Sequence, residues 1–185
     1  LVSMNPRPEL RIRGKAPEYP ANSIRQIPGA FERPTFRAGG RELTLDAIER
    51  DVIGGFDDAR ALLALSRGAV GGSRLKSEAF TAARLDRQLA TMTSELVTRR
   101  VLVQVDAGSN QLSVNPMFSW REALFTRALA GQAAAIFATR SPLERAVLAL
   151  IDPLLVPNEA EFLRKNEFRM VFHEFDWRLN DLTGR

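Results

Sequence analysis

The chain has 185 residues, of which 45% are hydrophobic and 26% are charged. This balance is typical of one globular domain with enough apolar surface for a core, and it argues against global disorder. The absence of cysteine excludes disulfides, thiolate metal sites and cysteine nucleophiles. No apolar run approaches the roughly 20 residues that a bilayer-spanning helix needs, so we expect no transmembrane segment.

The formal net charge of +4 is concentrated at the N-terminus. Residues 1–41 contain eight Lys or Arg and three Asp or Glu, a net charge of +5. Such a segment favours an anionic partner, and the alternative is a solvated arm. Few aromatic residues interleave with these charges, so we expect no nucleic-acid partner. The expected partners are other protein subunits, membrane-associated assemblies included, with candidate contacts at Arg7, Arg11, Arg13 and Lys15.

Proline divides the chain into two predicted parts. Six prolines fall within residues 1–34. Proline lacks an N–H and disfavours helix at the preceding residue. We therefore predict an extended, turn-rich and basic arm over residues 1–34, followed by a single domain over residues 35–185.

The predicted domain begins with a hairpin, a helix and an apolar run. Residues 35–43, centred on Gly39-Gly40, are typical of a hairpin. Thr44 has the place of an N-cap for a helix that ends at Gly54-Gly55. The apolar run 61–65 predicts a strand buried on both faces, and a helix is the alternative because alanine and leucine are not strand-specific.

A second helix and a second hairpin follow. The helix is expected after Thr81, and residues 101–105 and 111–114 flank the turn of the hairpin. The apolar face of the helix has the spacing of four, three and four residues, at Leu85, Leu89, Met92 and Leu96.

A third helix is expected from Phe118 to Phe137, because Asn115-Pro116 is a typical helix start. Gly131 is a weak point within it. Its apolar face is expected to consist of Phe118, Phe125, Leu129 and Ile136.

Two more helices and a strand complete the chain. Ser141-Pro142-Leu143-Glu144 combines an N-cap, a proline at the first helical position and a glutamate at the third. Asn158 is expected to cap a short helix over residues 159–166. Residues 168–175 predict a strand with Phe168, Met170 and Phe172 facing inward. The whole pattern indicates an α+β fold, with several helices packed on a small and mostly antiparallel sheet.

Several motifs occur in an order that is similar to one known family. They are Tyr19-Pro20 with Asn22-Ser23-Ile24-Arg25, the run from Gly40 to Glu49, Phe118-Ser119-Trp120, and the run from Phe175 to Asn180. With these motifs the chain resembles the domain of unknown function 547 family, over roughly residues 19–181. Bacterial members of that family are often exported, so the resemblance implies an extracytoplasmic location.

The chain departs from the family pattern at the positions that look chemical. Family members carry a histidine followed by a loop with two cysteines, a pair that looks like a base and a nucleophile. An ungapped comparison places Leu62 at the histidine, Arg67 at the first cysteine and Gly72-Ser73 at the second cysteine and its proline. Leucine cannot transfer a proton, and arginine neither attacks nor accepts a proton at neutral pH.

Three kinds of site remain to be weighed. Ser66 and Ser73 could act as nucleophiles only beside a base, and the one histidine of the chain is His173, with Asp176 nearby in sequence. Carboxylates alone make a weak metal site, and no metal or other cofactor is expected. A glycine-rich loop could instead bind an anion through Arg67, Gly71, Gly72 and Arg74, the alternative being a simple glycine turn.

The leading expectation is a non-catalytic interaction or structural subunit of a larger assembly, built on a degenerate enzyme-like fold. Its contact surfaces are expected on the N-terminal arm and on the helix from Phe118 to Phe137. The alternatives are a hydrolase-like enzyme that uses a serine with His173, and an anion-binding module at the Gly/Arg loop.

Overall fold

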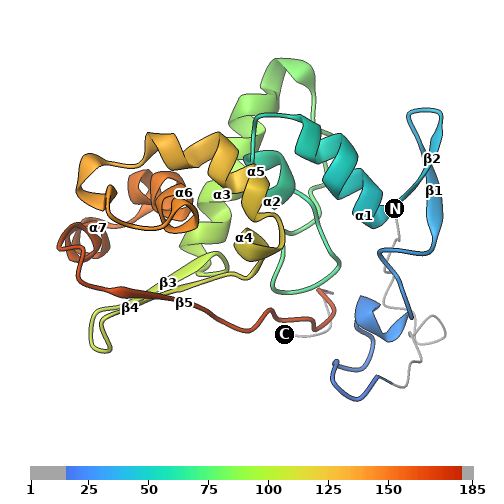
Figure 1. The fold of residues 1–185 in the computed structure, drawn as a ribbon. Helices are drawn as coiled ribbons and strands as arrows, with labels where there is room; N and C mark the ends of the chain where they lie inside the picture. Colours follow the sequence, from blue (N-terminus) through green and yellow to red (C-terminus); the bar gives the residue numbers. More distant parts are fainter. Residues whose placement is uncertain (1–15, 181–185) are drawn as a thin grey trace. The chain divides into compact units, whose positions relative to one another are not determined.

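The computed structural model describes residues 16–180 (Figure 1). The candidate contacts Arg7, Arg11, Arg13 and Lys15 lie outside these residues. The described chain divides into two compact units, and residues 16–34 belong to the first of them. The first unit comprises residues 16–55, 62–79 and 176–180, and the second comprises residues 56–61 and 80–175.

The expected α+β class is confirmed, because helices occur with one two-stranded and one three-stranded sheet. The three-stranded sheet has the order β3-β4-β5, antiparallel between the first two strands and parallel between the last two. None of the helices within residues 16–180 has the length and apolarity that crossing a membrane requires.

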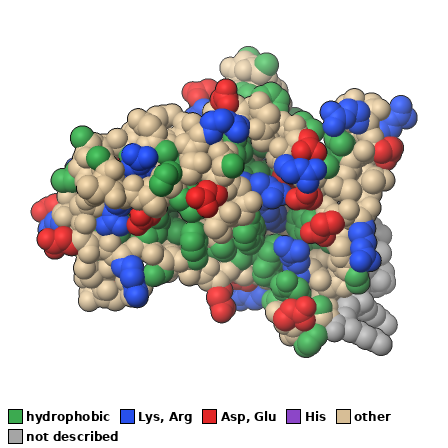
Figure 2. All heavy atoms as spheres, viewed as in Figure 1, with side chains coloured by type: hydrophobic (Ala, Val, Ile, Leu, Met, Phe, Trp, Pro, Cys, Tyr) green, Lys and Arg blue, Asp and Glu red, His purple; other side chains and the backbone are tan. Residues whose placement is uncertain are grey.

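The first unit contains the predicted N-terminal hairpin. Strands β1 (Thr35–Ala38) and β2 (Arg41–Thr44) pair antiparallel, and the turn between them is Gly39-Gly40. Both glycines have positive φ, 59° and 76°, a conformation that residues with a Cβ rarely adopt. Basic and acidic side chains are mixed on the visible face of this hairpin (Figure 2).

The helix predicted after Thr44 is present but irregular. The Thr44 hydroxyl accepts a hydrogen bond from the Ala47 N–H at 3.1 Å, which confirms the N-cap. The helical stretch ends at Gly54-Gly55, as expected. It consists of α1 (Leu45–Ala47), a π-helical turn η3 (Ile48–Val52) and a 3₁₀ turn η4 (Ile53–Gly55).

The strand predicted over residues 61–65 is wrong. The chain forms a short helix there, α2 (Arg60–Leu63). The Asp58 carboxylate accepts hydrogen bonds from the Arg60 N–H at 3.0 Å and from its guanidinium, which starts the helical turn. Alanine and leucine then continue a helix more readily than a strand.

The longer stretch of the second unit, residues 80–175, begins with a 3₁₀ turn, η5 (Ala82–Arg84), and the long helix α3 (Leu85–Thr98). Leu89, Met92 and Leu96 are buried, as the spacing predicts, whereas Leu85 is 43% exposed. The second hairpin is confirmed as β3 (Val103–Asp106) and β4 (Gln111–Val114).

The last strand is shorter than predicted. Strand β5 (Arg169–Phe172) lies at the edge of the sheet, parallel to β4. Phe168 precedes it and is buried, but Phe172 is 48% exposed, so its predicted inward position is wrong. Because β5 is an edge strand, it has a neighbouring strand on one side only, and its last residue, Phe172, is accessible to solvent.

The helix predicted from Phe118 to Phe137 is broken into segments. Phe118, Phe125 and Phe137 are buried, whereas Ile136 is 52% exposed, contrary to expectation. The Asn115 side chain caps the start by accepting from the Met117 N–H at 3.0 Å. The segments are α4 (Met117–Trp120), α5 (Glu122–Leu129), η6 (Ala130–Gln132, which contains Gly131) and η7 (Ala135–Phe137).

Helix α6 (Pro142–Ile151) packs beside α5 and buries Val147, Leu148 and Ile151 (Figure 1). A 3₁₀ turn, η8 (Asp152–Leu154), leads to α7 (Pro157–Arg164). The predicted cap at Asn158 is wrong, because α7 already begins at Pro157, a residue suited to the first helical position.

The capping box of α6 provides a stability test. The Ser141 hydroxyl accepts from the Glu144 N–H at 3.3 Å, and the Glu144 carboxylate accepts from the Ser141 N–H at 3.0 Å. Ser141→Ala should lower the free energy of unfolding by about 1 kcal/mol. Urea unfolding followed by circular dichroism measures this loss. Ser141→Asn, which can still cap, should recover most of it, and equal losses in both variants would contradict the role of the cap.

Candidate functional site

The loop after α2 is built around a buried ion pair in the first unit. Arg67 and Glu49 are 5% and 8% exposed, and Arg67 Nη2 lies 2.7 Å from Glu49 Oε2. Glu49 projects from the π-helical turn η3. The position where the resemblance implies a nucleophile is therefore occupied by a guanidinium that a carboxylate neutralises.

Burying this ion pair carries a desolvation cost that its surroundings must offset. Removing two charges from water costs several kcal/mol for each ion, and close contact is needed to offset that cost. A π-helical turn widens the helix locally, and such turns are frequent at functional sites. At Glu49, η3 carries the carboxylate that faces the loop.

Three N–H groups of the loop donate hydrogen bonds to backbone carbonyl groups. The Val70 and Gly71 N–H groups donate to the carbonyls of Arg178 and Asp176, each at 2.9 Å. The Gly72 N–H donates to the Ala69 carbonyl at 3.1 Å. The anion-binding candidates thus lie in one loop, but Arg67 pairs with Glu49 and both glycine N–H groups donate to protein carbonyls, while Arg74 is exposed.

The serine candidates differ in their surroundings. Ser66 is exposed, and its hydroxyl oxygen accepts from the Gly68 N–H at 3.3 Å. Ser73 is fully buried, and its hydroxyl donates to the Leu63 carbonyl. Both serines belong to the first unit and His173 belongs to the second, so neither is brought to the histidine within one unit.

Asp176 also belongs to the first unit, where it binds an arginine. Its carboxylate accepts from the Arg178 guanidinium at 3.0 Å and from the Arg178 N–H at 3.0 Å. The hydrogen bond from the guanidinium lowers the pKa of the Asp176 carboxyl, so it stays ionised. This carboxylate therefore serves as the local partner of Arg178.

His173 instead lies near a serine that sequence reasoning missed. In the second unit, Ser113 Oγ is 3.5 Å from His173 Nδ1, across the parallel strands β4 and β5. Burial lowers the pKa of His173, and a hydrogen bond with the Val101 backbone acts in the opposite direction. The imidazole is therefore neutral at pH 7, with Nδ1 directed to the serine hydroxyl. The two residues are sixty positions apart, and no sequence signal predicted the pairing of their strands.

An aromatic cluster anchors the C-terminal segment within the first unit. The Arg25 guanidinium carbon lies 4.4 Å from the ring centre of Trp177 and 5.0 Å from that of Phe31. The rings of Tyr19 and Trp177 meet edge to face at 6.2 Å. Cation–π contacts of this kind stabilise a partly buried arginine. Trp177 thereby connects residues 19–31 to the segment that binds the loop.

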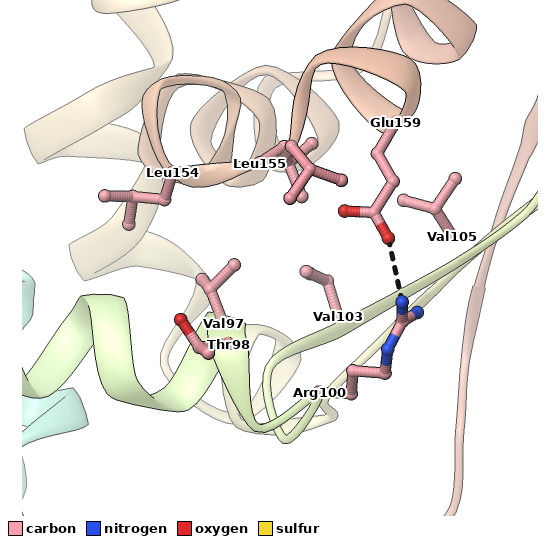
Figure 3. Close-up of a pocket in the computed structure, with 9 residues that line it drawn as sticks. Val97, Thr98, Arg100, Val103, Val105, Leu154, Leu155 and Glu159 are labelled. Atoms are coloured by element: carbon pink, nitrogen blue, oxygen red, sulfur yellow. Dashed lines mark ion pairs between the residues drawn. The ribbon is translucent and has the colours of Figure 1, made fainter.

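The second unit contains a pocket of about 130 Å³ at the end of α3 (Figure 3). Arg100 and Glu159 form an ion pair of 3.2 Å across it, and Thr98 adds a polar group. The sequence does not predict this site, because its residues come from the end of α3 and the turn after it, from β3, and from the stretch between η8 and the first turn of α7. Its apolar wall is formed by Val97, Val103, Val105, Leu154, Leu155 and Val156.

Among residues 16–180, no group of three or more His, Asp or Glu side chains is placed to hold a metal ion. Comparisons with protein-family models, with curated proteins and with solved structures found no match to the chain.

The buried ion pair can be tested by unfolding experiments. Glu49→Gln removes the negative charge opposite Arg67 and should lower the free energy of unfolding by about 3–5 kcal/mol. Glu42→Gln, at an exposed position of the hairpin, should change it by less than about 0.5 kcal/mol. Urea unfolding at pH 7 gives both values.

A double variant guards against a simple failure to fold. Replacing both charges, with Glu49→Leu and Arg67→Met, should recover most of the stability because no unbalanced charge remains buried. If the single and double variants lose the same stability, the two side chains do not act as a pair.

Proposed function

We propose that this chain is a non-catalytic interaction or structural subunit of a larger protein assembly, built on a degenerate enzyme-like fold. The observation that carries the proposal is the buried pair of Arg67 and Glu49. Arginine is protonated throughout the physiological range and is neither a nucleophile nor a base. Leu62, at the position where the resemblance implies a base, is fully buried and aliphatic.

The remaining groups of the loop are used to hold the chain together. Backbone N–H groups that could stabilise an anion donate instead to the C-terminal segment, and Ser73 donates to a backbone carbonyl. A loop organised in this way supports the fold. We infer that the first unit is a rigid platform whose role is to present surface to other proteins.

Exposed apolar side chains supply a contact for such a role. In the first unit, residues 74–79 are exposed and include Leu75 at 68%. In the second unit, residues 80–87 are exposed and include Phe80 and Leu85 at 43% each. Large exposed apolar side chains that lie close together are typical of an interaction site. By contrast, the phenylalanines of the expected contact helix, Phe118, Phe125 and Phe137, are buried in the second unit.

The N-terminal basic residues give a direct test of the proposal. Residues 1–15 can be removed without losing Ala16, whose backbone exchanges two hydrogen bonds with the Gln26 side chain, at 3.0 and 2.8 Å. The truncated protein should keep its unfolding temperature and lose most of its co-purification with the native partner. Affinity purification from the native host, with quantitative mass spectrometry, measures the loss.

A charge-matched comparison separates electrostatics from truncation. Neutralising four basic residues of the arm should weaken co-purification at least as much as 0.5 M salt does, because salt screens the Coulomb attraction between a basic segment and an anionic partner. Neutralising four exposed basic residues elsewhere should not. If the arm variant co-purifies with the partner as well as the unchanged protein does, the proposal for the arm is overturned. The arm variant changes Arg7, Arg11, Arg13 and Lys15 to Gln, and the control changes Arg37, Arg41, Lys165 and Arg169, all exposed, to Gln.

One observation favours a second function, a serine hydrolase. The approach of Ser113 Oγ to His173 Nδ1 resembles a nucleophile beside its base, and the distance of 3.5 Å would shorten when substrate binds. No comparable observation favours the anion-binding module, because the loop N–H groups and Arg67 have protein partners.

Hydrolysis of p-nitrophenyl esters by the full chain tests the second function. Neutral imidazole is the base, and burial lowers the pKa of His173 below 6.5, so the rate should rise with pH and reach half its maximum below pH 6.5. Ser113→Ala and His173→Gln should each lower the rate at least about 100-fold. Ser66→Ala, at an exposed serine, should leave it unchanged. Equal rates in all four proteins would rule this function out.

A further inference from the structure

We propose that the pocket at the end of α3 binds a small aliphatic ammonium group, with Glu159 as its counter-ion and Arg100 as a displaceable gate (Figure 3). The ligand is either a free alkylamine or a lysine side chain, which share this chemistry. The site lies entirely within the second unit and does not depend on the proposed role of the first.

The size and lining of the pocket suit a short hydrocarbon chain. Its volume is about 130 Å³. An aliphatic cavity of about 150 Å³ binds benzene, so four or five methylene groups fit a pocket of this size. Val97 and Val103 are almost fully buried, and Figure 3 shows Leu154 and Leu155 on the opposite wall. Burial of a hydrocarbon chain against these side chains favours binding.

The two charges of the pocket are unequally exposed. The Glu159 side chain is 17% exposed, whereas that of Arg100 is 61% exposed. Glu159 lies in the first turn of α7, where the helix dipole favours a carboxylate. A largely buried carboxylate needs a cation, but an exposed guanidinium is held only weakly. The geometry therefore lets another cation take the place of Arg100 beside Glu159.

The backbone of Arg100 is an independent sign of a function. Its φ is 55°, in the left-handed region where glycine or asparagine usually ends a helix. The Arg100 N–H donates to the Val97 carbonyl at 2.8 Å, as α3 terminates. A long charged residue in this conformation is strained, and such strain occurs where the side chain has a role. Here the strained residue holds its guanidinium across the pocket from Glu159.

The sign of the ligand charge follows from this arrangement. An anionic ligand would have to bind Arg100 from within the pocket. Its negative group would then lie close to the Glu159 carboxylate, which is 3.2 Å from the Arg100 guanidinium, and the two negative charges would repel each other. An ammonium group meets the carboxylate directly and places its chain against the valines. A cationic ligand thus uses both the charge and the apolar wall.

Binding of n-pentylamine to the full chain, measured by titration calorimetry and NMR, tests the proposal. A dissociation constant of about 1 mM is expected for a ligand of this size. Glu159→Gln should weaken binding at least tenfold, whereas Arg100→Gln should strengthen it severalfold because the competing cation is gone. Glu161→Gln, an exposed position on the same helix, should have no effect. Val105→Phe, which fills the pocket without changing its charge, should abolish binding.

Two further probes identify the ligand. N-pentanoate should bind at least tenfold more weakly than n-pentylamine. Nα-acetyl-lysine methylamide binding more tightly than n-pentylamine assigns the site to a lysine side chain, and the reverse order assigns it to a free amine. The proposal is overturned if Arg100→Gln weakens amine binding, if Glu159→Gln leaves it unchanged, if pentanoate binds better, or if neither amine probe binds.

Discussion

The first unit depends on the buried contact between Arg67 and Glu49, which holds the loop after α2 against the turn η3. Two side chains that are 4% and 10% exposed can remain charged only if they stay together. Their contact fixes one end of the loop. The C-terminal segment fixes the rest through the N–H groups of Val70 and Gly71, and Trp177 ties that segment to the cluster around Arg25.

These contacts are the physical basis of the structural role that we propose for the loop. A reactive loop needs unpaired donors and a side chain that can gain or lose a proton. Here the N–H groups of Val70, Gly71 and Gly72 and the Ser73 hydroxyl donate to backbone carbonyl groups, and Arg67 contacts the opposite charge. An apolar pair of similar volume would fill the same space at no greater cost, whereas removing one partner of the pair would leave a buried charge uncompensated.

Sequence analysis succeeded where a structure depends on neighbouring residues. The cap at Thr44, the capping box at Ser141 and the two hairpins are short-range patterns, and all four are present. It failed where tertiary contacts decide. The apolar run 61–65 fits both a buried strand and a helix, and the alternative, a helix, is the one that forms. The alternation of residues 168–172 predicts an inward Phe172, but the edge position of β5 is not visible in the sequence. The partner of Arg67 lies 18 residues away and that of His173 lies 60 away, separations that no local pattern encodes.

The two arginine–glutamate pairs show how burial changes the meaning of one contact. Arg67 and Glu49 are both buried, so separating them would leave charges without water, and the pair acts as a permanent clamp. Arg100 is mostly exposed and Glu159 mostly buried, so the arginine can leave for water while the carboxylate still requires a cation. The same residue types therefore close one site and leave the other able to exchange its cation. Because the exchangeable pair borders an apolar pocket, the ligand recognition that we propose lies in the second unit, away from the loop where the sequence first directed attention.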